Sequence, residues 1–219
     1  MKLRIIYDNE AKEGLESDWG FSCLVEAEDK KILFDTGASG EILSHNMQRL
    51  GIRREDIEII ALSHEHWDHI GGLDAALHQN VAVYIPSSFS RRTKKRIEES
   101  AAEVLEVSGP ADIVSGVHTT GELGRMTKEQ SLVLETKGNK GVVVLTGCAH
   151  PGLETILEAA KVFGELHGVI GGFHGFDKLE LLKELKMIIP CHCTVRKEEI
   201  MRMYQEKAVW CGAGGIIEI

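Results

Sequence analysis

The order of apolar and polar residues divides the chain into an early part rich in strands and a late part in which helices and strands alternate. In the early part, short apolar or alternating runs predict strands at residues 3–7, 21–27, 31–34, 57–62 and 81–85. Apolar residues on one helical face predict helices at residues 41–50 and 94–105. The run at 57–62 is apolar almost throughout, which indicates a strand buried on both faces.

The rest of the chain continues with both kinds of element. Further strands are predicted at residues 113–114, 131–135, 142–145, 168–170, 187–189 and 215–219, and helices at residues 153–163 and 178–185. Strands followed by alternating helices and strands are typical of sheets sandwiched by helices. No repeat or linker interrupts the pattern, so we expect one domain over residues 1–219, of the α/β or α+β class.

The composition is that of an ordinary globular protein, with 43% hydrophobic and 27% charged residues. No apolar run approaches the ~20 residues of a membrane helix, so we expect no membrane contact. The first residues lack the features of a signal peptide, which predicts a cytoplasmic protein. The net charge of -9 opposes binding to nucleic-acid phosphates, and the basic run at residues 91–96 is short. We therefore expect a small-molecule substrate and no nucleic acid.

The strongest chemical signal follows directly after the strand at 57–62. His64 and His66 are two residues apart, so the period of a strand turns both side chains to the same side. Asp68 and His69 follow within one turn, and imidazole nitrogen and carboxylate oxygen are both zinc ligands. Any one of these residues alone would be interpreted as a solvated loop side chain, and Asp68 as a cap of the next helix. Four donors in six positions instead favour a metal site.

Residues 63–73, S-H-E-H-W-D-H-I-G-G-L, resemble the H-x-H-x-D-H signature of the metallo-β-lactamase superfamily. Residues 33–37, L-F-D-T-G, resemble the early strand-to-loop motif of the same superfamily. The resemblance implies a four-layer αβ/βα sandwich with the metals at one edge of the sheets. It also implies the first ligands by position: His64 and His66 for one metal, and Asp68 and His69 for the second. Later loops would add a histidine, a bridging carboxylate and another histidine.

The sequence departs from the superfamily pattern where the bridging carboxylate is expected. The strand at 142–145 leads to Cys148 in that place, and His150 follows two positions later. We predict His150 as the third histidine ligand, while Cys148 either binds metal as a thiolate or packs as a small buried side chain. His174 and His192 each follow a strand, and both are candidates for the last histidine. An odd count of five cysteines predicts reduced thiols.

Later motifs extend the resemblance into the last third of the chain. These are T-G-E at 120–122, E-Q-S-L at 129–132, T-G-C-A-H-P-G at 146–152, G-G-F-H at 171–174 and P-C-H-C-T at 190–194. They resemble the subfamily labelled 7,8-dihydropterin-6-yl-methyl-4-(β-D-ribofuranosyl)aminobenzene-5'-phosphate synthase-like. The label does not fix the substrate of this chain, because function resides in the pocket and not in the fold.

One or two divalent metal ions at this site, zinc first with iron or manganese as alternatives, predict a hydrolase that activates water against an ester, lactone, phosphoester or related bond. Asp68 would orient the nucleophile, and Asp35 would accept a hydrogen bond from a ligand imidazole. The proton for the leaving group would come from a metal-bound water or from a loop histidine such as His174 or His192. Two other functions stay open: a non-haem di-iron redox enzyme, since imidazole also suits iron, and a non-catalytic module that binds metal or ligand.

Overall fold

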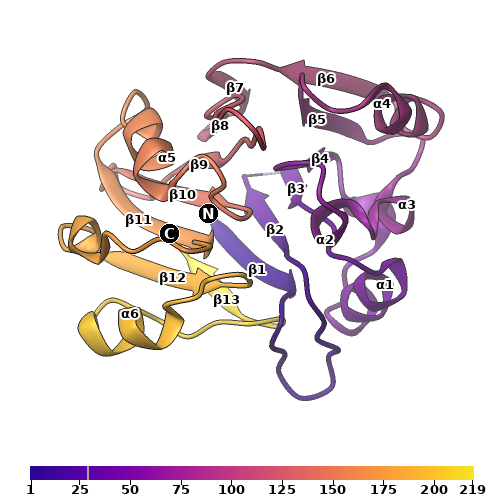
Figure 1. Cartoon of the computed structure of the whole chain (residues 1–219). Coiled ribbons are helices and arrows are strands. Elements are labelled where there is room, and N and C mark those ends of the chain that lie inside the picture. Colours follow the sequence, from indigo (N-terminus) through magenta and orange to yellow (C-terminus); the bar gives the residue numbers. More distant parts are fainter. Residues whose placement is uncertain (29) are drawn as a thin grey trace.

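The computed structural model describes residues 1–28 and 30–219, and it contains two mixed β-sheets between outer helices (Figure 1). The first sheet has the strand order β13-β1-β2-β3-β4-β5-β6. Its strands are β1 (Lys2–Tyr7), β2 (Ser22–Ala27), β3 (Lys30–Phe34), β4 (Ile59–Ala61), β5 (Ala82–Pro86), β6 (Glu103–Val107) and β13 (Ile216–Glu218). The pairs from β13 to β3 are antiparallel, and those from β3 to β6 are parallel.

The second sheet has the strand order β12-β11-β10-β9-β8-β7. Its strands are β7 (Ala111–Val114), β8 (Val117–Thr119), β9 (Leu132–Glu135), β10 (Val142–Thr146), β11 (Leu166–Gly172) and β12 (Met187–Cys191). β10, β11 and β12 are parallel, while the pairs from β7 to β10 are antiparallel. Each sheet therefore joins an antiparallel part to a parallel part.

Three apolar clusters hold the layers together. The inner cluster joins the two sheets, with Phe34 from one sheet and Leu132 and Ile170 from the other. Outside the first sheet lie α1 (Gly40–Arg49), the short α2 (Trp67–Ile70) and α3 (Leu73–Ala76), and α4 (Arg91–Glu98). Outside the second sheet lie α5 (Leu153–Ala160), the 3-10 turn Leu179–Leu182 and α6 (Lys197–Met203). Figure 1 shows these two sets of helices on opposite sides of the paired sheets.

Helix α1 illustrates how local sequence sets an element. Ser39 caps its N-terminus by accepting a hydrogen bond from the Ile42 N–H at 3.4 Å. Leu43 and Met47 lie on the buried face, and Gly51 has φ of 70° just beyond the last turn. The helix predicted at residues 41–50 is therefore confirmed, with the stop signal where the sequence places it.

Two of the predicted helices are wrong in part. The helix predicted at 94–105 ends at Glu98, and residues 103–107 form strand β6, which pairs in parallel with β5. Its sequence E-V-L-E-V suits either period, and the pairing with β5 decides for a strand. Residues 178–185 form only the 3-10 turn Leu179–Leu182. Strand β8 and helix α6 were not predicted, and the strand predicted at 57–62 is shortened to Ile59–Ala61.

No helix in the described part of the chain combines the length and the apolar character needed to cross a bilayer.

Candidate metal centre

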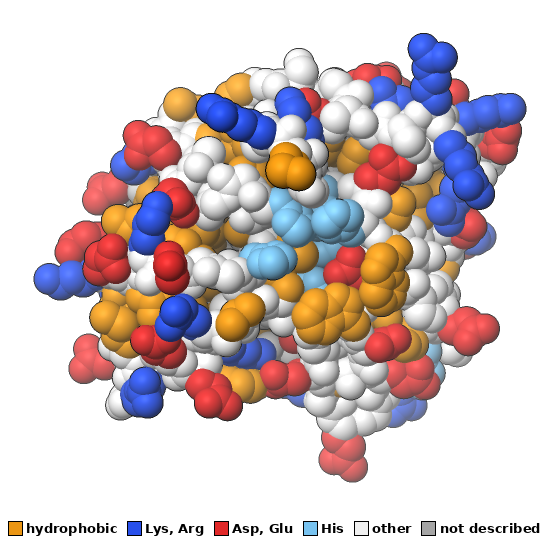
Figure 2. All heavy atoms as spheres, viewed as in Figure 1, with side chains coloured by type: hydrophobic (Ala, Val, Ile, Leu, Met, Phe, Trp, Pro, Cys, Tyr) orange, Lys and Arg blue, Asp and Glu red, His pale blue; other side chains and the backbone are white. Residues whose placement is uncertain are grey.

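The predicted donors lie at the carboxyl ends of parallel strands from both sheets. β3 leads into Asp35, β4 into His64, β10 into Cys148 and His150, and β12 into His192. Open α/β sheets place their binding residues at such ends, because the connecting loops meet there. Figure 2 shows histidine side chains gathered in the middle of one face of the molecule, with hydrophobic side chains around them. Loops from distant parts of the sequence therefore contribute to one site.

The first group of donors, here called the imidazole cluster, consists of His64, His66 and His150. The Nδ1 atom of His66 lies 3.0 Å from His64 Nε2 and 3.2 Å from His150 Nε2. Ligand atoms around a tetrahedral zinc with bonds of about 2.0–2.1 Å lie about 3.3 Å apart. The spacing and the three nitrogen donors therefore fit one divalent ion.

The second group, here called the mixed cluster, consists of Asp68, His69, Cys148 and His192, all buried. His69 Nε2 lies 3.1 Å from Cys148 Sγ, and His192 Nε2 lies 3.2 Å from Asp68 Oδ2. This second contact lacks hydrogen-bond geometry, so the buried His192 Nε2 has no hydrogen-bond partner among residues 1–28 and 30–219. A buried lone pair that no donor satisfies is costly unless a cation takes it. The donor set of the mixed cluster therefore also fits a divalent metal.

The buried histidines share one arrangement, in which an oxygen holds Nδ1 and leaves Nε2 for the cluster. The three pairs and their N···O distances are His64 with Ser63 Oγ (2.9 Å), His69 with Asp35 Oδ2 (2.7 Å) and His192 with Asn9 Oδ1 (2.9 Å). Partners of this kind fix the tautomer and the ring orientation of metal-binding histidines. The neighbouring oxygen atoms therefore hold three imidazoles in the tautomer and orientation that metal binding requires.

Asp35 connects the two clusters. Its carboxylate accepts hydrogen bonds from the Ser63 N–H and hydroxyl, both at 2.7 Å, and from His69 Nδ1. Since the Ser63 hydroxyl donates to Asp35, its oxygen is left to accept from His64 Nδ1. Asp35 also has φ of 56°, a conformation that costs about 1 kcal/mol or more in a non-glycine residue. One buried carboxylate therefore orients an imidazole in each cluster.

Glu129 holds the loop that carries the later donors. Its buried carboxylate accepts hydrogen bonds from the backbone N–H groups of residues 147–150, at 2.9–3.1 Å. That loop carries Cys148 for the mixed cluster and His150 for the imidazole cluster. Burial raises the pKa of Glu129, and the N–H donors oppose this rise by favouring the carboxylate. Glu129 belongs to the sequence motif at residues 129–132, but that motif did not indicate its role in holding the loop.

Two rings of the imidazole cluster, those of His64 and His150, favour the neutral form. Burial, together with the neighbouring His69, lowers the pKa of His64 well below its ordinary value. Burial and the nearby His66 lower the pKa of His150 to about 4. Neutral imidazole is the form that binds a metal, so these nitrogens are ready for ligation in the physiological range.

The mixed cluster has a different charge balance. Burial alone would lower the pKa of His69, but the Asp35 carboxylate raises it above the ordinary value. Burial opposes the charged form of Asp68, yet the contact with His192 and the nearby His69 lower its pKa. A hydrogen bond from Cys193 and burial raise the pKa of Cys148. A metal at this cluster would have to displace the proton of the Cys148 thiol.

His174 lies outside both clusters. Its side chain is exposed, and its ring centroid lies 5.1 Å from that of His150. Of the two histidines that follow late strands, the structure therefore brings His192 to the mixed cluster and leaves His174 beside the imidazole cluster. Both have positive φ, 46° for His174 and 44° for His192, as strained residues at functional sites often do.

Two residues of the long loop between β1 and β2 support the mixed cluster and were not predicted. Asn9 holds His192 through Nδ1, and its side-chain amide donates to the His192 carbonyl at 3.0 Å. Trp19 Nε1 donates to Asp68 Oδ2 at 2.9 Å. Nothing in the local sequence pattern marks either residue, because the loop reaches the site only through the tertiary fold.

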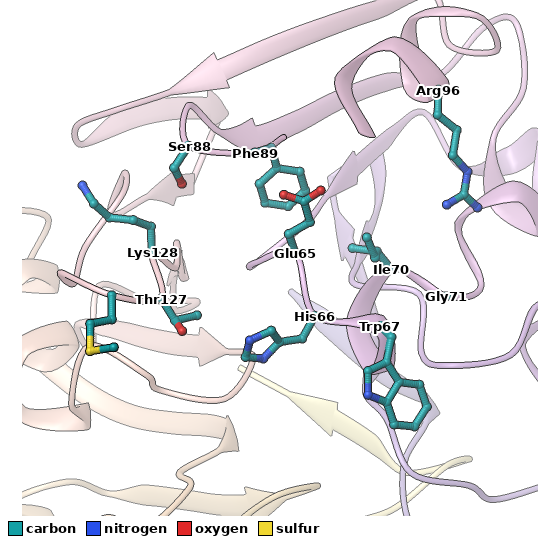
Figure 3. A pocket seen from close by; sticks show the side chains of 11 residues that line it. Glu65, His66, Trp67, Ile70, Gly71, Ser88, Phe89, Arg96, Thr127 and Lys128 are labelled. Atoms are coloured by element: carbon teal, nitrogen blue, oxygen red, sulfur yellow. The ribbon is translucent and has the colours of Figure 1, made fainter. Parts of the chain in front are cut away.

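A cleft of about 530 Å³ opens beside His66. Figure 3 shows Glu65, His66 and Trp67 on one side of it, and Ser88, Thr127 and Lys128 across from them. Trp67 is 62% exposed and Met126 is 99% exposed, so apolar surface borders the cleft next to the imidazole cluster. A small molecule therefore has room to reach His66 from solvent.

Comparisons with known proteins agree with this architecture. A family model of the metallo-β-lactamase superfamily matches residues 20–192. The chain is 28% identical to the 7,8-dihydropterin-6-methyl-4-(β-D-ribofuranosyl)-aminobenzene-5'-phosphate synthase of Methanocaldococcus jannaschii, over 87% of this chain and 86% of that protein. It is 29% identical to an N-acyl homoserine lactonase of Bacillus cereus, over 56% of this chain and 60% of the lactonase.

The crystal structure of Tm1679, a metal-dependent hydrolase of the β-lactamase superfamily, superposes on this chain with a TM-score of 0.82 at 25% identity, covering 100% of this chain and 99% of the other. The sandwich of two mixed sheets between helices is therefore confirmed. The family match at residues 20–192 includes every donor of the imidazole and mixed clusters. This chain belongs to the metallo-β-lactamase superfamily.

Proposed function

We propose that the chain is a metal-dependent hydrolase that cleaves an ester, lactone, phosphoester or related bond of a small molecule. The observation that carries the proposal is the pair of adjacent donor clusters, which offer seven ligand atoms at one edge of the sheets. When bound, divalent ions supply Lewis acidity and lower the pKa of water from about 15.7 toward about 7. Hydrolysis at neutral pH is the reaction that this chemistry favours.

The donor atoms favour zinc. The imidazole cluster offers three nitrogens, and the mixed cluster offers two nitrogens, a carboxylate oxygen and a sulfur. Imidazole and thiolate are preferred ligands of zinc, whereas manganese prefers oxygen ligands. Iron is the alternative that imidazole also suits, and its use would point to the redox function. Metal analysis of protein purified without added metal distinguishes the two.

The protein side chains would position and protonate the reactants. Trp19 holds one carboxylate oxygen of Asp68, which fixes the orientation of that ligand. His174 is exposed next to His150 and lies outside both clusters, so it is free to give a proton to a leaving group. Asp35 stays buried and acts through His69 and Ser63.

The cleft beside His66 supports a small substrate with an apolar part. Trp67, Phe89 and Ile70 offer apolar contact, while Lys128 and Arg96 lie at the polar side. Both cations already have acidic neighbours, Glu122 at 2.8 Å and Asp74 at 2.7 Å, so the cleft has little unpaired positive charge for a polyanion. The net charge of -9 also opposes a nucleic-acid substrate. The lactonase relative makes lactones the first substrates to test.

The test is a screen of lactones, esters, thioesters and phosphodiesters, read together with metal content for the natural chain and for His66→Ala. His66 is exposed, so its replacement should leave the fold intact while removing one ligand of the imidazole cluster. We expect the variant to lose metal at this cluster and to lose turnover. His45→Ala, at a half-buried histidine whose partner is Glu16, is the control. Full turnover by metal-free protein or by His66→Ala would refute the proposal, and ligand binding without turnover would favour the binding module.

A further inference from the structure

Two cysteines from different loops face each other beside the mixed cluster. The Sγ atoms of Cys148, after β10, and Cys193, after β12, lie 3.3 Å apart. The Cys193 thiol also lies 3.9 Å from the Cys148 carbonyl oxygen. A disulfide needs a sulfur separation of about 2.05 Å, so a small movement of one side chain brings the two atoms to bonding distance.

The backbone of β11 keeps the Cys193 thiol in this place. A Cβ atom added to Gly172 would lie 2.7 Å from Cys193 Sγ and 3.4 Å from Cys148 Cα. The absent side chain of Gly172 therefore makes the space that the thiol fills. The pair is built by three chain segments, which meet only in the folded protein.

Cys193 differs from the other four cysteines in its exposure to solvent. Cys193 is half-buried, whereas the remaining cysteines, Cys23, Cys148, Cys191 and Cys211, are buried. A small oxidant in solvent therefore meets Cys193 first, and Cys148 is the thiol placed to react with the oxidised sulfur. An accessible cysteine next to a second, resolving cysteine is the arrangement of redox-active pairs.

We propose that Cys148 and Cys193 form an oxidisable pair, which a peroxide converts to a disulfide and a thiol reductant restores. In the first step the Cys193 thiol attacks the peroxide O–O bond, giving a sulfenic acid and one molecule of water. In the second step the Cys148 sulfur attacks the Cys193 sulfur, the S–O bond breaks, and the hydroxide and the thiol proton leave as a second water. The two sulfurs together lose two electrons and two protons, which reduce the peroxide.

The bond would remove a donor from the mixed cluster. Cys148 Sγ lies 3.1 Å from His69 Nε2 in that cluster, and a disulfide sulfur no longer offers the thiolate that binds a metal. Oxidation would leave Asp68, His69 and His192 as the remaining donors. This effect on metal content rests on the proposed function, whereas the bond itself does not.

The experiment treats the full-length protein, once freed of metal by a chelator and once loaded with zinc, with hydrogen peroxide. In denaturant, the thiol count should fall from the five free cysteines to three, and a non-reduced digest should contain a peptide pair joined through Cys148 and Cys193. Dithiothreitol should restore all five thiols. In the zinc-loaded sample we expect oxidation to release about one equivalent of metal, because one cluster loses a ligand.

The test variant is Cys193→Ser, which should form no linked peptide and keep its zinc. The matched control is Cys191→Ala. Cys191 is only two residues away but is buried in the core between the sheets, so its replacement should leave the linkage unchanged. A linkage through Cys191, or none in the natural chain, would overturn the proposal. A Cys148–Cys193 bond with zinc retained would overturn the effect on the mixed cluster. Failure to bind zinc at all would count against the proposed function, while the linked peptide would still report the bond.

Discussion

The imidazole cluster and the mixed cluster lie side by side, with the rings of His64 and His69 only 4.2 Å apart, yet they differ in exposure and charge. The imidazole cluster has nitrogen donors only, and one of its residues, His66, is exposed beside the cleft. The mixed cluster is buried throughout and includes a carboxylate and a thiol. A buried site depends on the groups that hold its ligands, because water cannot replace a lost partner there. We therefore expect substrate contact at the first cluster and structural sensitivity at the second.

The largest effect is expected from Asp35→Ala, because this carboxylate supports both clusters. Its loss removes the partner of the buried His69, whose pKa it raises, and leaves the Ser63 N–H without an acceptor. Breaking a fully buried pair of this kind costs about 3–5 kcal/mol. Chemical denaturation of the metal-free protein should show this loss of stability, and metal analysis should show less metal at both clusters.

Asp112→Ala is the control for Asp35→Ala. Asp112 also contacts a histidine, His118, at 2.6 Å, but its side chain is 80% exposed. An exposed pair contributes less than about 1 kcal/mol, so this variant should keep its metal and almost all of its stability. Equal losses in the two variants would contradict the role given to Asp35.

The next largest effect is expected from a decrease in pH, which should change the metal affinities of the two clusters to different degrees. His64 and His150 have lowered pKa values, about 4 for His150, so at these two rings of the imidazole cluster protons compete with metal only in strongly acidic solution. The raised pKa of Cys148 means that metal binding at the mixed cluster releases a thiol proton. At pH values below that pKa, the metal affinity of the mixed cluster should increase about tenfold for each unit by which the pH is raised.

The measurement uses one variant per cluster. His192→Ala leaves the imidazole cluster intact, and His66→Ala leaves the mixed cluster intact. Zinc affinity measured by chelator competition between about pH 5 and 8 should change less steeply in the first variant than in the second. Parallel slopes would show that the two clusters do not differ in the way their surroundings indicate.

The same contrast explains how far the sequence could predict the site. Local spacing was sufficient to predict the four donors that lie in one short run after a strand, which are His64, His66, Asp68 and His69. The choice between His174 and His192 was not local, because both follow strands and only the tertiary fold brings one of them to the mixed cluster.

The residues that hold the metal donors in place were harder to predict from the sequence than the donors themselves. Asn9 and Trp19 act across the fold from a loop without periodicity, and Glu129 acts through the backbone of another loop. The order of strands and helices predicted the α/β or α+β class, and the resemblance implied the four-layer sandwich. Residues 103–105 of β6 were predicted as the end of a helix, because the pairing of β6 with β5 is a non-local contact that the sequence does not show.

A smaller and more selective effect is expected from Asn9→Ala. Within the mixed cluster, the Asn9 side chain contacts His192 alone. The loss of this side chain therefore frees the His192 ring to rotate. Removing such a supporting partner typically lowers metal affinity by about 10–100-fold. Titration should show this decrease at one of two zinc equivalents, with the other unchanged. Asn80→Ala, at an exposed asparagine beside His78, should change neither. A decrease at both equivalents would contradict the separation of the clusters.

The smallest effect is expected from Trp19→Phe, which keeps the aromatic ring but removes the hydrogen bond to Asp68 Oδ2. Trp19 is 47% exposed, so water can replace part of the lost bond, and metal affinity of the mixed cluster should fall by only several-fold, about 1 kcal/mol. Trp210→Phe is the matched control, because Trp210 is 48% exposed and also donates to a carboxylate, that of Glu10. Zinc titration of the two variants separates a role at the cluster from the general cost of losing an indole N–H. A larger effect in Trp19→Phe than in Asn9→Ala would show that the orientation of Asp68, more than that of His192, limits the mixed cluster.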